Sequence, residues 1–402
     1  MTSPTQPPLD APDDQWLVYA DALQEAGDPR GELIALNHDV EKGGATQQRD
    51  AFVKQHAEAL LGAAGAHLQA YGLDWRRCLV TRAAIRVGPG DDAALLVGGL
   101  LGSPTAAGIG AIELVGVAQG DDDRIDLSPG VAAIVKQYPA SCTSVALVDE
   151  RARQSQSLIS RDYDPDTNLV SFGSLAELAA VPHLERLQIV TADTYQTDFR
   201  EIQAPGLRSF VLHGLRFAQA YDTPSDLTQQ LSSIQWPGLE EFEARLAETF
   251  TASVPDETGA YVAVYANMDD APDPEEYGEE DGWNEGVDYS QELAPLLENL
   301  KQTPLKRLAL TSFDSAQQLL DALKTHGLPA TLEELDLSDS SLTSDHVSFF
   351  LENKELFAGL KRLVLKGTAI DEETAATLQT LGPEIQHTPG GGAVYRFLVG
   401  ME

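Results

Sequence analysis

Three short leucine-spaced segments near the C-terminal end constrain the fold of this 402-residue chain more than any other feature. They are Leu305-x-x-Leu308-x-Leu310, Leu332-x-x-Leu335-x-Leu337 and Leu360-x-x-Leu363-x-Leu365. Their first leucines lie 27 and then 28 residues apart. A segment this short cannot bury its own leucines, so each copy must stack against a neighbouring copy.

Five less regular copies precede these three. They begin at Ile109, Cys142, Leu184, Leu207 and Leu239, and each keeps the apolar spacing i, i+3 and i+5. Short strands repeated at such intervals are typical of leucine-rich repeats. Helix-like runs fall between the strands, over residues 92–101, 130–138, 174–180, 315–325, 344–351 and 372–381. The sequence therefore predicts an α/β leucine-rich-repeat solenoid, a horseshoe with strands on its concave side and helices outside.

Two further strands are expected at the ends of this array. Ala83–Val87 is rich in β-forming residues and would cap the first repeat. Residues 393–399 follow a run of three glycines and would form a last strand that closes the open end. Repeat proteins need such caps because an unpaired terminal repeat exposes apolar surface. We therefore assign residues 79–402 to the repeat domain.

The first 78 residues follow a helical pattern. Residues 1–12 are polar and proline-rich, which predicts a disordered arm. A helix is expected from Asp13, and Gly27-Asp28-Pro29 ends it. Asp28 is then placed to cap a second helix, with Pro29 at its first position. A third helix is expected over Gln47–Tyr71, so residues 13–78 are predicted to form a small all-α domain.

One stretch of this helical domain resembles a known family. The 19 residues Trp16–Ile34, WLVYADALQEAGDPRGELI, are similar to the repeat-companion domain of myxobacterial and planctomycete proteins. The likeness extends more loosely to Trp75–Arg77, and it departs from the family at Ala22, where a second Trp or a similarly bulky residue is usual. The resemblance implies a bacterial, cytoplasmic protein with leucine-rich repeats after the helices. It implies no biochemical activity, because the family has no agreed one.

The longest interval between copies, 66 residues from Leu239 to Leu305, carries an acidic insertion over about residues 250–290. Residues 260–266 open it with a strand-like run. Asp and Glu then supply nearly half of the positions from Asp269 to Tyr289. Disordered acidic tracts are usually poor in aromatic residues, but this one contains several. We expect an ordered, negatively charged loop, and a solvated loop without a partner is the alternative.

Composition limits the class of partner. The formal net charge is −36, from 63 acidic and 27 basic residues. Nucleic acid and anionic membrane surfaces would repel such a chain, whereas a basic protein would be attracted. The chain has no signal-peptide pattern and no run of about 20 apolar residues that could span a membrane. Its two cysteines form no disulfide framework, so a cytoplasmic location is expected.

No catalytic motif is found in the sequence. It lacks a nucleophile elbow, a phosphate-binding loop and a paired-histidine metal motif. Asp162–Asn168 and Asp121–Asp126 place several carboxylates close together, as calcium loops do, but the first lacks the required Gly and the final bidentate Glu. We therefore expect no enzyme activity, no cofactor and no metal site.

The favoured function is a non-enzymatic scaffold that binds a basic protein partner. The residue between the last two pattern positions of each copy should face the concave side. The expected partner-binding residues among these are Gln188, Glu243 and Asp336. The acidic insertion should add aromatic anchors and carboxylates beside them. Its expected partner-binding residues are Tyr277, Glu280, Asp281, Trp283 and Tyr289.

Two alternatives stay open. A regulator, immunity or adaptor protein of a bacterial conflict or secretion system would also use an acidic surface, for example against a basic toxin. A metal-dependent enzyme would use carboxylates of the acidic insertion for acid–base work or metal binding. The sequence does not define the oligomeric state.

Overall fold

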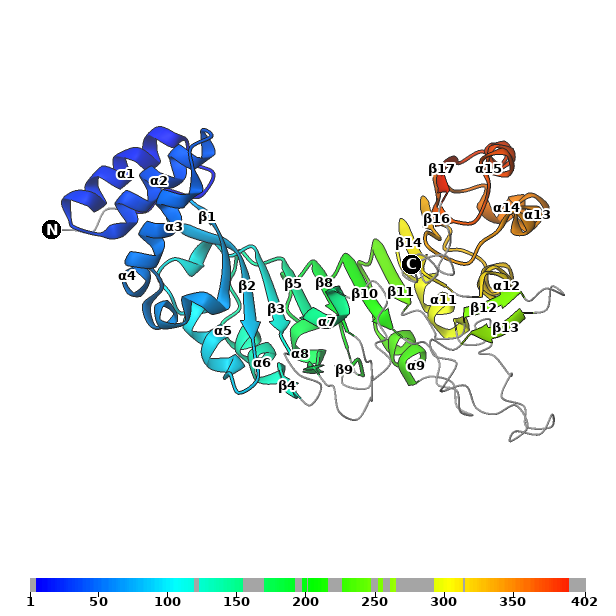
Figure 1. Ribbon diagram of the computed structural model, residues 1–402, viewed down its shortest axis with the longest axis horizontal. Helices are drawn as coiled ribbons and strands as arrows, with labels where there is room; N and C mark the ends of the chain where they lie inside the picture. Colours follow the sequence, from blue (N-terminus) through cyan, green and yellow to red (C-terminus); the bar gives the residue numbers. More distant parts are fainter. Residues whose placement is uncertain are drawn as a thin grey trace.

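The protein has a mixed α/β fold organised around a large, mostly parallel sheet (Figure 1). The computed structural model describes residues 5–118, 123–154, 170–191, 197–200, 202–215, 226–246, 252–255, 261–264, 293–313 and 315–389. Within these residues the large sheet has eleven strands, and three two-stranded ribbons accompany it.

The strands of the large sheet lie side by side in the order in which they occur in the chain. They are β1 (Tyr71–Arg76), β2 (Leu79–Val87), β3 (Ala111–Gly116), β5 (Ser144–Asp149), β8 (Arg186–Val190), β10 (Ser209–Leu215), β11 (Glu241–Leu246), β14 (Arg307–Thr311), β15 (Glu334–Asp336), β16 (Arg362–Thr368) and β17 (Glu384–Pro389). β1 pairs with β2 in the antiparallel sense, and the other neighbours are parallel.

The leucine pattern sets the register of this sheet. The middle apolar residues of all eight predicted copies are direct cross-strand neighbours: Ile112, Val145, Leu187, Phe210, Phe242, Leu308, Leu335 and Leu363. All eight are buried in one continuous core. Because side chains alternate across a strand, the residues before and after them point to the other face. The eight predicted strands and the expected strand at Ala83–Val87 are therefore all present.

Helices lie along one side of the sheet, as the alternation of strands and helical runs predicts (Figure 1). They are α5 (Ala93–Leu101), α6 (Ser128–Lys136), α8 (Ala176–Ala179), α9 (Asp226–Ser233), α11 (Ala294–Leu300), α12 (Ala316–His326), α13 (Val347–Glu352), α14 (Lys354–Phe357) and α15 (Glu372–Leu378), with short 3-10 turns at Ala106–Gly108, Ser344–His346 and Gln379–Leu381. The apolar faces of α5, α6 and α12 belong to the same core as the strand leucines.

One helix departs from this arrangement. α7 (Glu150–Gln154) follows β5 directly, and Ala152 of α7 packs on Val115, Val148 and Val190. These three valines alternate with the core-facing residues of β3, β5 and β8, so α7 lies on the opposite face of the sheet. The same face carries Gln188, Glu243 and Asp336, three of the residues that are expected to bind a partner.

The N-terminal helices begin as the sequence predicts. α1 spans Asp13–Glu25, and α2 spans Pro29–Glu41 with Asp28 as its N-cap, which accepts a hydrogen bond from the Arg30 amide. Residues 5–12 form neither helix nor strand. However, Pro8 accepts a hydrogen bond of 3.1 Å from the Trp16 indole, and Leu9 packs on the core. This part of the arm therefore contacts the helical domain.

The expected single helix over Gln47–Tyr71 is wrong. The segment instead forms α3 (Thr46–Gln55), α4 (Ala57–Leu61) and a 3-10 turn, η1 (Gly62–Ala70), which leads into β1. The helix breaks first at His56, whose backbone is not helical, and again at Gly62, whose φ of 59° is incompatible with a continuing α-helix. The sheet therefore begins at Tyr71, within the stretch that was assigned to the helical domain.

Arg77 fixes the helical domain to the first strands. It sits in the turn between β1 and β2 with φ of 60° and is almost fully buried. Its guanidinium bonds Asp13 of α1 and Glu41 of α2, and its carbonyl accepts a hydrogen bond from Asn37. Helices and sheet consequently share one core, which runs from Trp16 to Leu378.

The structure describes little of the acidic insertion. β12 (Ala252–Pro255) and β13 (Tyr261–Val264) form an antiparallel ribbon, which agrees with the strand expected at residues 260–266. The remaining ribbons are β4 (Ile125–Asp126) with β6 (Val170–Ser171), and β7 (Gly173–Ser174) with β9 (Thr197–Asp198). The strand expected at residues 393–399 lies outside the described residues, and the last strand they contain is β17.

Candidate interaction surface on the strand face

The face of the sheet that carries α7 is lined by rows of cross-strand neighbours. We call it the strand face. Its central row contains every residue expected to face the concave side: Glu113, Ala146, Gln188, Val211, Glu243, Ala309, Asp336 and Val364. Ala84 of β2 and Gln386 of β17 extend this row at either end. The structure thus places Gln188, Glu243 and Asp336 in one line across the sheet.

A second row, two residues earlier on each strand, alternates in charge over its last five members. It contains Arg82, Ala111, Ser144, Arg186, Ser209, Glu241, Arg307, Glu334, Arg362 and Glu384. Neighbouring members form ion pairs, such as Arg307 with Glu334 at 2.9 Å and Arg362 with the other oxygen of Glu334. The strand face therefore neutralises much of its own charge.

Arg307 is the centre of the carboxylate-rich part of this face. Its Nη1 lies 2.7 Å from Glu243 Oε2 and its Nη2 3.2 Å from Asp336 Oδ2, in addition to the bond from Nε to Glu334. Burial alone would lower the pKa of Arg307, but the three carboxylates outweigh it and raise the pKa. Glu243 and Asp336 flank Ala309 in the central row, and Arg307 bonds both of these carboxylates. Ala309 itself is 0% exposed.

His213 is the second partner of Glu243. Its Nε2 lies 2.7 Å from Glu243 Oε1, and because an ionised carboxylate can only accept, this nitrogen carries the proton. The hydrogen bond from His213 and the contact with Arg307 lower the pKa of Glu243 to about 2, against partial burial, which acts in the opposite direction. Glu243 is thus ionised throughout the neutral range and is engaged on both oxygens.

Unusual backbone conformations gather beside this cluster, where the strands end. Ser312 has φ of 62° and Asp339 has φ of 59°, a region that residues with side chains rarely adopt. The Nε of Arg245 lies 3.3 Å from Ser312 Oγ, and its Nη2 lies 3.9 Å from Asp339. Gly367 also has positive φ, and a Cβ there would lie 2.3 Å from Asp339 Oδ1. Arg245 therefore connects the C-terminal end of β11 to the residues that follow β14 and β15.

A cation-rich cluster occupies the other half of the strand face. Arg82 and Arg86 of β2 and Arg153 of α7 surround Glu113 and Glu150. We call these five residues the arginine shelf. Arg82 lies 2.8 Å from one oxygen of Glu113 and Arg86 3.2 Å from one oxygen of Glu150, while Arg153 bonds the remaining oxygen of each glutamate. The five side chains carry a formal net charge of +1.

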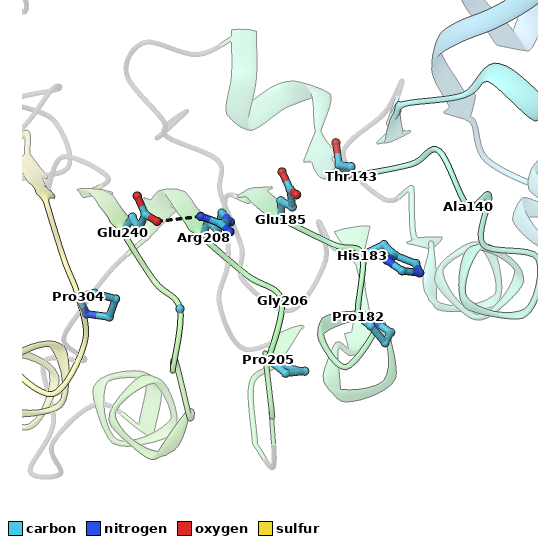
Figure 2. A pocket seen from close by; sticks show the side chains of 11 residues that line it. Ala140, Thr143, Pro182, His183, Glu185, Pro205, Gly206, Arg208, Glu240 and Pro304 are labelled. Carbon is cyan, nitrogen blue, oxygen red and sulfur yellow. Dashed lines mark hydrogen bonds and ion pairs between the residues drawn. The ribbon is translucent and has the colours of Figure 1, made fainter. Parts of the chain in front are cut away.

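The edge where the strands begin holds a shallow groove of about 490 Å³ (Figure 2). Figure 2 shows Thr143, Glu185, Arg208 and Glu240 following one another along successive chain segments above three prolines. Arg208 and Glu240 pair at 2.9 Å, and Lys306 pairs with the other oxygen of Glu240 at 2.6 Å. Lys361 pairs likewise with Glu333 at 2.8 Å. The lysines that follow the first leucine of a repeat therefore neutralise acidic neighbours.

The expected partner-binding residues of the acidic insertion cannot be placed on this surface. Tyr277, Glu280, Asp281, Trp283 and Tyr289 all lie outside the described residues, as does the loop Asp162–Asn168. Of the second candidate calcium loop, Asp126 caps the Ser128 amide at 2.9 Å. Within the described part of the chain, no group of three His, Cys, Asp or Glu residues is arranged to hold a metal ion.

Sequence reasoning missed most of the charged partners on the strand face. His213 and Arg82 lie outside the central row, so the repeat pattern does not predict their contacts with it. Arg307 and Arg362 occupy matching positions after the first leucine of their repeats, where basic residues are expected to neutralise acidic neighbours, and both pair with carboxylates. The alternation of charge along the second row was the available signal, since Arg307, Glu334 and Arg362 each directly precede a strand leucine. Among the helices that the structure describes, none is long and apolar enough to cross a membrane.

Comparisons with known proteins add little to this description. No protein-family model matches the chain, and no curated protein matches it. Among solved structures, the chain is similar to the crystal structure of a Bacteroides fragilis protein, with 14% sequence identity, 77% of each chain covered and a TM-score of 0.49. A likeness of this size carries no argument about family or activity.

Proposed function

We propose that the protein is a non-enzymatic scaffold that binds a protein partner on its strand face. The architecture proposed is a leucine-rich-repeat horseshoe preceded by a repeat-companion domain, in a bacterial cytoplasmic protein. The observation that carries the proposal is the unbroken register of the central row across ten strands, from Ala84 to Gln386. Such a row presents side chains at regular intervals to one extended ligand.

The proposed partner is basic overall. The net charge of −36 produces a field that attracts cations from beyond contact distance. Residues 265–292 contribute to it strongly, because they contain eleven Asp and Glu residues and neither Lys nor Arg. Long-range attraction of this kind accelerates encounter, while contacts on the strand face decide which partner stays bound.

Site-directed photo-crosslinking in cells of the source organism tests this proposal. A photo-reactive amino acid at Gln188 or Ala146 samples the strand face, and one at Leu95 or Lys136 samples the helical side. We expect covalent adducts with one partner from the two strand-face positions and none from the two control positions. Equal labelling from both sides, or no adduct from either, would reject the scaffold function.

A further inference from the structure

The arginine shelf is the place on the strand face where cations outnumber the carboxylates that they contact. Its three guanidinium groups carry five N–H donors each, whereas its two carboxylates offer four oxygens. All four oxygens already accept a bond from an arginine. The Arg82, Arg86 and Arg153 side chains are nevertheless 59%, 44% and 41% exposed, so donors remain accessible to a ligand.

The glutamates of the shelf are much less accessible. Their side chains are only 9% exposed for Glu113 and 12% for Glu150. An approaching ligand therefore meets guanidinium groups first, held in place by carboxylates beneath them. Arginines fixed in this way lose little conformational freedom when they bind a carboxylate in the bidentate manner.

The floor next to the shelf is built from small side chains. Ala84 and Ala111, with Ser144 and Ala146, are half-buried neighbours on β2, β3 and β5. α7 stands beside them as a wall, because Ala152 is anchored on the valines of the strand face. A flat floor of Ala and Ser lets the backbone of an extended peptide approach the sheet without a steric clash.

The opposite half of the strand face has the reverse polarity. Around Arg307, the carboxylates of Glu243, Glu334 and Asp336 outnumber the two arginines that bind them, Arg307 and Arg362. Glu113 and Glu243 lie four strands apart in the central row, which corresponds to about 19 Å at a strand spacing of about 4.8 Å. About six residues of an extended peptide cover that distance.

We propose that the arginine shelf binds an acidic peptide segment of the partner. The ligand is a run of Asp or Glu side chains in extended conformation, which lies across β2, β3 and β5 with its carboxylates on Arg82, Arg86 and Arg153. The segment that follows it reaches the carboxylate-rich half, so the two halves together set the direction in which the peptide lies. This assignment specifies a ligand for the proposed scaffold and rests on that proposed function.

The test uses the full-length chain and a fluorescently labelled hexaglutamate peptide, measured by fluorescence anisotropy at low salt. A protein with net charge −36 repels this probe everywhere except at a local cationic site, so binding itself is informative. Arg82→Gln and Arg153→Gln should each weaken binding roughly tenfold, as expected for the loss of a charge-assisted hydrogen bond. Arg208→Gln is the matched control, since it removes an equally exposed, singly paired arginine far from the shelf.

The Glu113→Gln variant distinguishes an electrostatic effect on peptide binding from a folding defect. It removes a negative charge from beneath the arginines but keeps a side-chain oxygen that accepts a hydrogen bond from one of them, so binding should become several-fold tighter, whereas a misfolded shelf would bind more weakly. Failure of the wild-type chain to bind hexaglutamate, equal binding by all variants, or weaker binding by Glu113→Gln would each overturn the proposal. Stronger binding of a six-nucleotide oligothymidylate than of hexaglutamate would overturn the assignment to a peptide. Strand-face crosslinks together with any of these outcomes would leave the scaffold function standing.

Discussion

Glu243 shows how single residues on the strand face are tied to neighbours far away in the sequence. Its contact with Arg307 joins residues 64 positions apart, and its contact with His213 joins residues 30 apart. Each contact bridges adjacent strands, so it depends on the order of strands in the sheet. The pattern of leucines predicted that Glu243 faces this side, but it could not predict which cation would reach it.

The depressed pKa of Glu243 leads to a pH-dependent contribution to stability. Because the pKa of Glu243 is about 2 in the folded state and that of a free Glu side chain is 4.5, the stabilisation is complete above about pH 4.5 and is lost as the pH falls towards 2. Glu243→Gln should lower the free energy of unfolding by about 1–3 kcal/mol at pH 7. The difference from the wild type should shrink as the pH is lowered through that window, measured by urea unfolding.

Glu352→Gln is the control for this experiment, since Glu352 is exposed at the end of α13. It should change the free energy of unfolding by less than about 0.5 kcal/mol at either pH. A wild type whose advantage over Glu243→Gln stays constant from pH 7 to pH 3 would contradict the assigned pKa.

At the scale of the elements, the sequence predicted the strands of the repeats better than the helices of the N-terminal domain. All eight copies became strands because buried leucines at i, i+3 and i+5 require a fixed register. The apolar residues of Gln47–Tyr71 favoured one long helix, but the backbone leaves helical geometry at His56 and again at Gly62. The alternation of Tyr71, Leu73 and Trp75, each at least partly buried, was the overlooked signal for β1.

A substitution at Gly367 of β16 gives the most specific stability prediction at the scale of the elements. Gly367 forms an irregularity in β16, has φ of 71°, and would place a Cβ 2.3 Å from the Asp339 carboxylate. Gly367→Ala should therefore lower the free energy of unfolding by about 1–3 kcal/mol in urea titrations. Gly359→Ala, where a Cβ meets nothing within 4 Å, should stay within about 0.5 kcal/mol of the wild type. Equal effects of the two substitutions would show that the bulge tolerates a side chain.

At the scale of the whole molecule, the core is continuous, but each strand of the large sheet pairs only with the strands next to it in chain order among the members of that sheet. The sequence predicted this stacking, because each repeat needs a neighbour to bury its leucines. It did not predict that the helical domain would share the core, since that depends on the turn at Arg77. A destabilising substitution at one end should therefore increase local unfolding in the adjacent strands, and this effect should decrease with distance along the sheet.

Native-state hydrogen exchange can measure that spread. Trp16→Ala removes a fully buried side chain from α1 and should cost about 3–5 kcal/mol locally. Amide exchange in β1 and β2 should accelerate, while exchange in β16 stays unchanged. Phe357→Ala, at the other end of the core, should accelerate amide exchange in β16 and leave exchange in β1 and β2 unchanged. Uniform acceleration in both variants would show instead that the molecule unfolds as one unit.

The sequential order of the strands also shapes how the protein emerges from the ribosome. Each new strand can dock on the one made just before it, so the sheet can grow during translation from the N-terminal helices onwards. The exception is β11, whose next partner β14 is separated from it by residues 247–306. At roughly 5–20 residues per second, the open edge of β11 waits about 3–12 s for that partner. An unpaired edge is where chains on neighbouring ribosomes could join, so chaperone demand should peak at this point of synthesis.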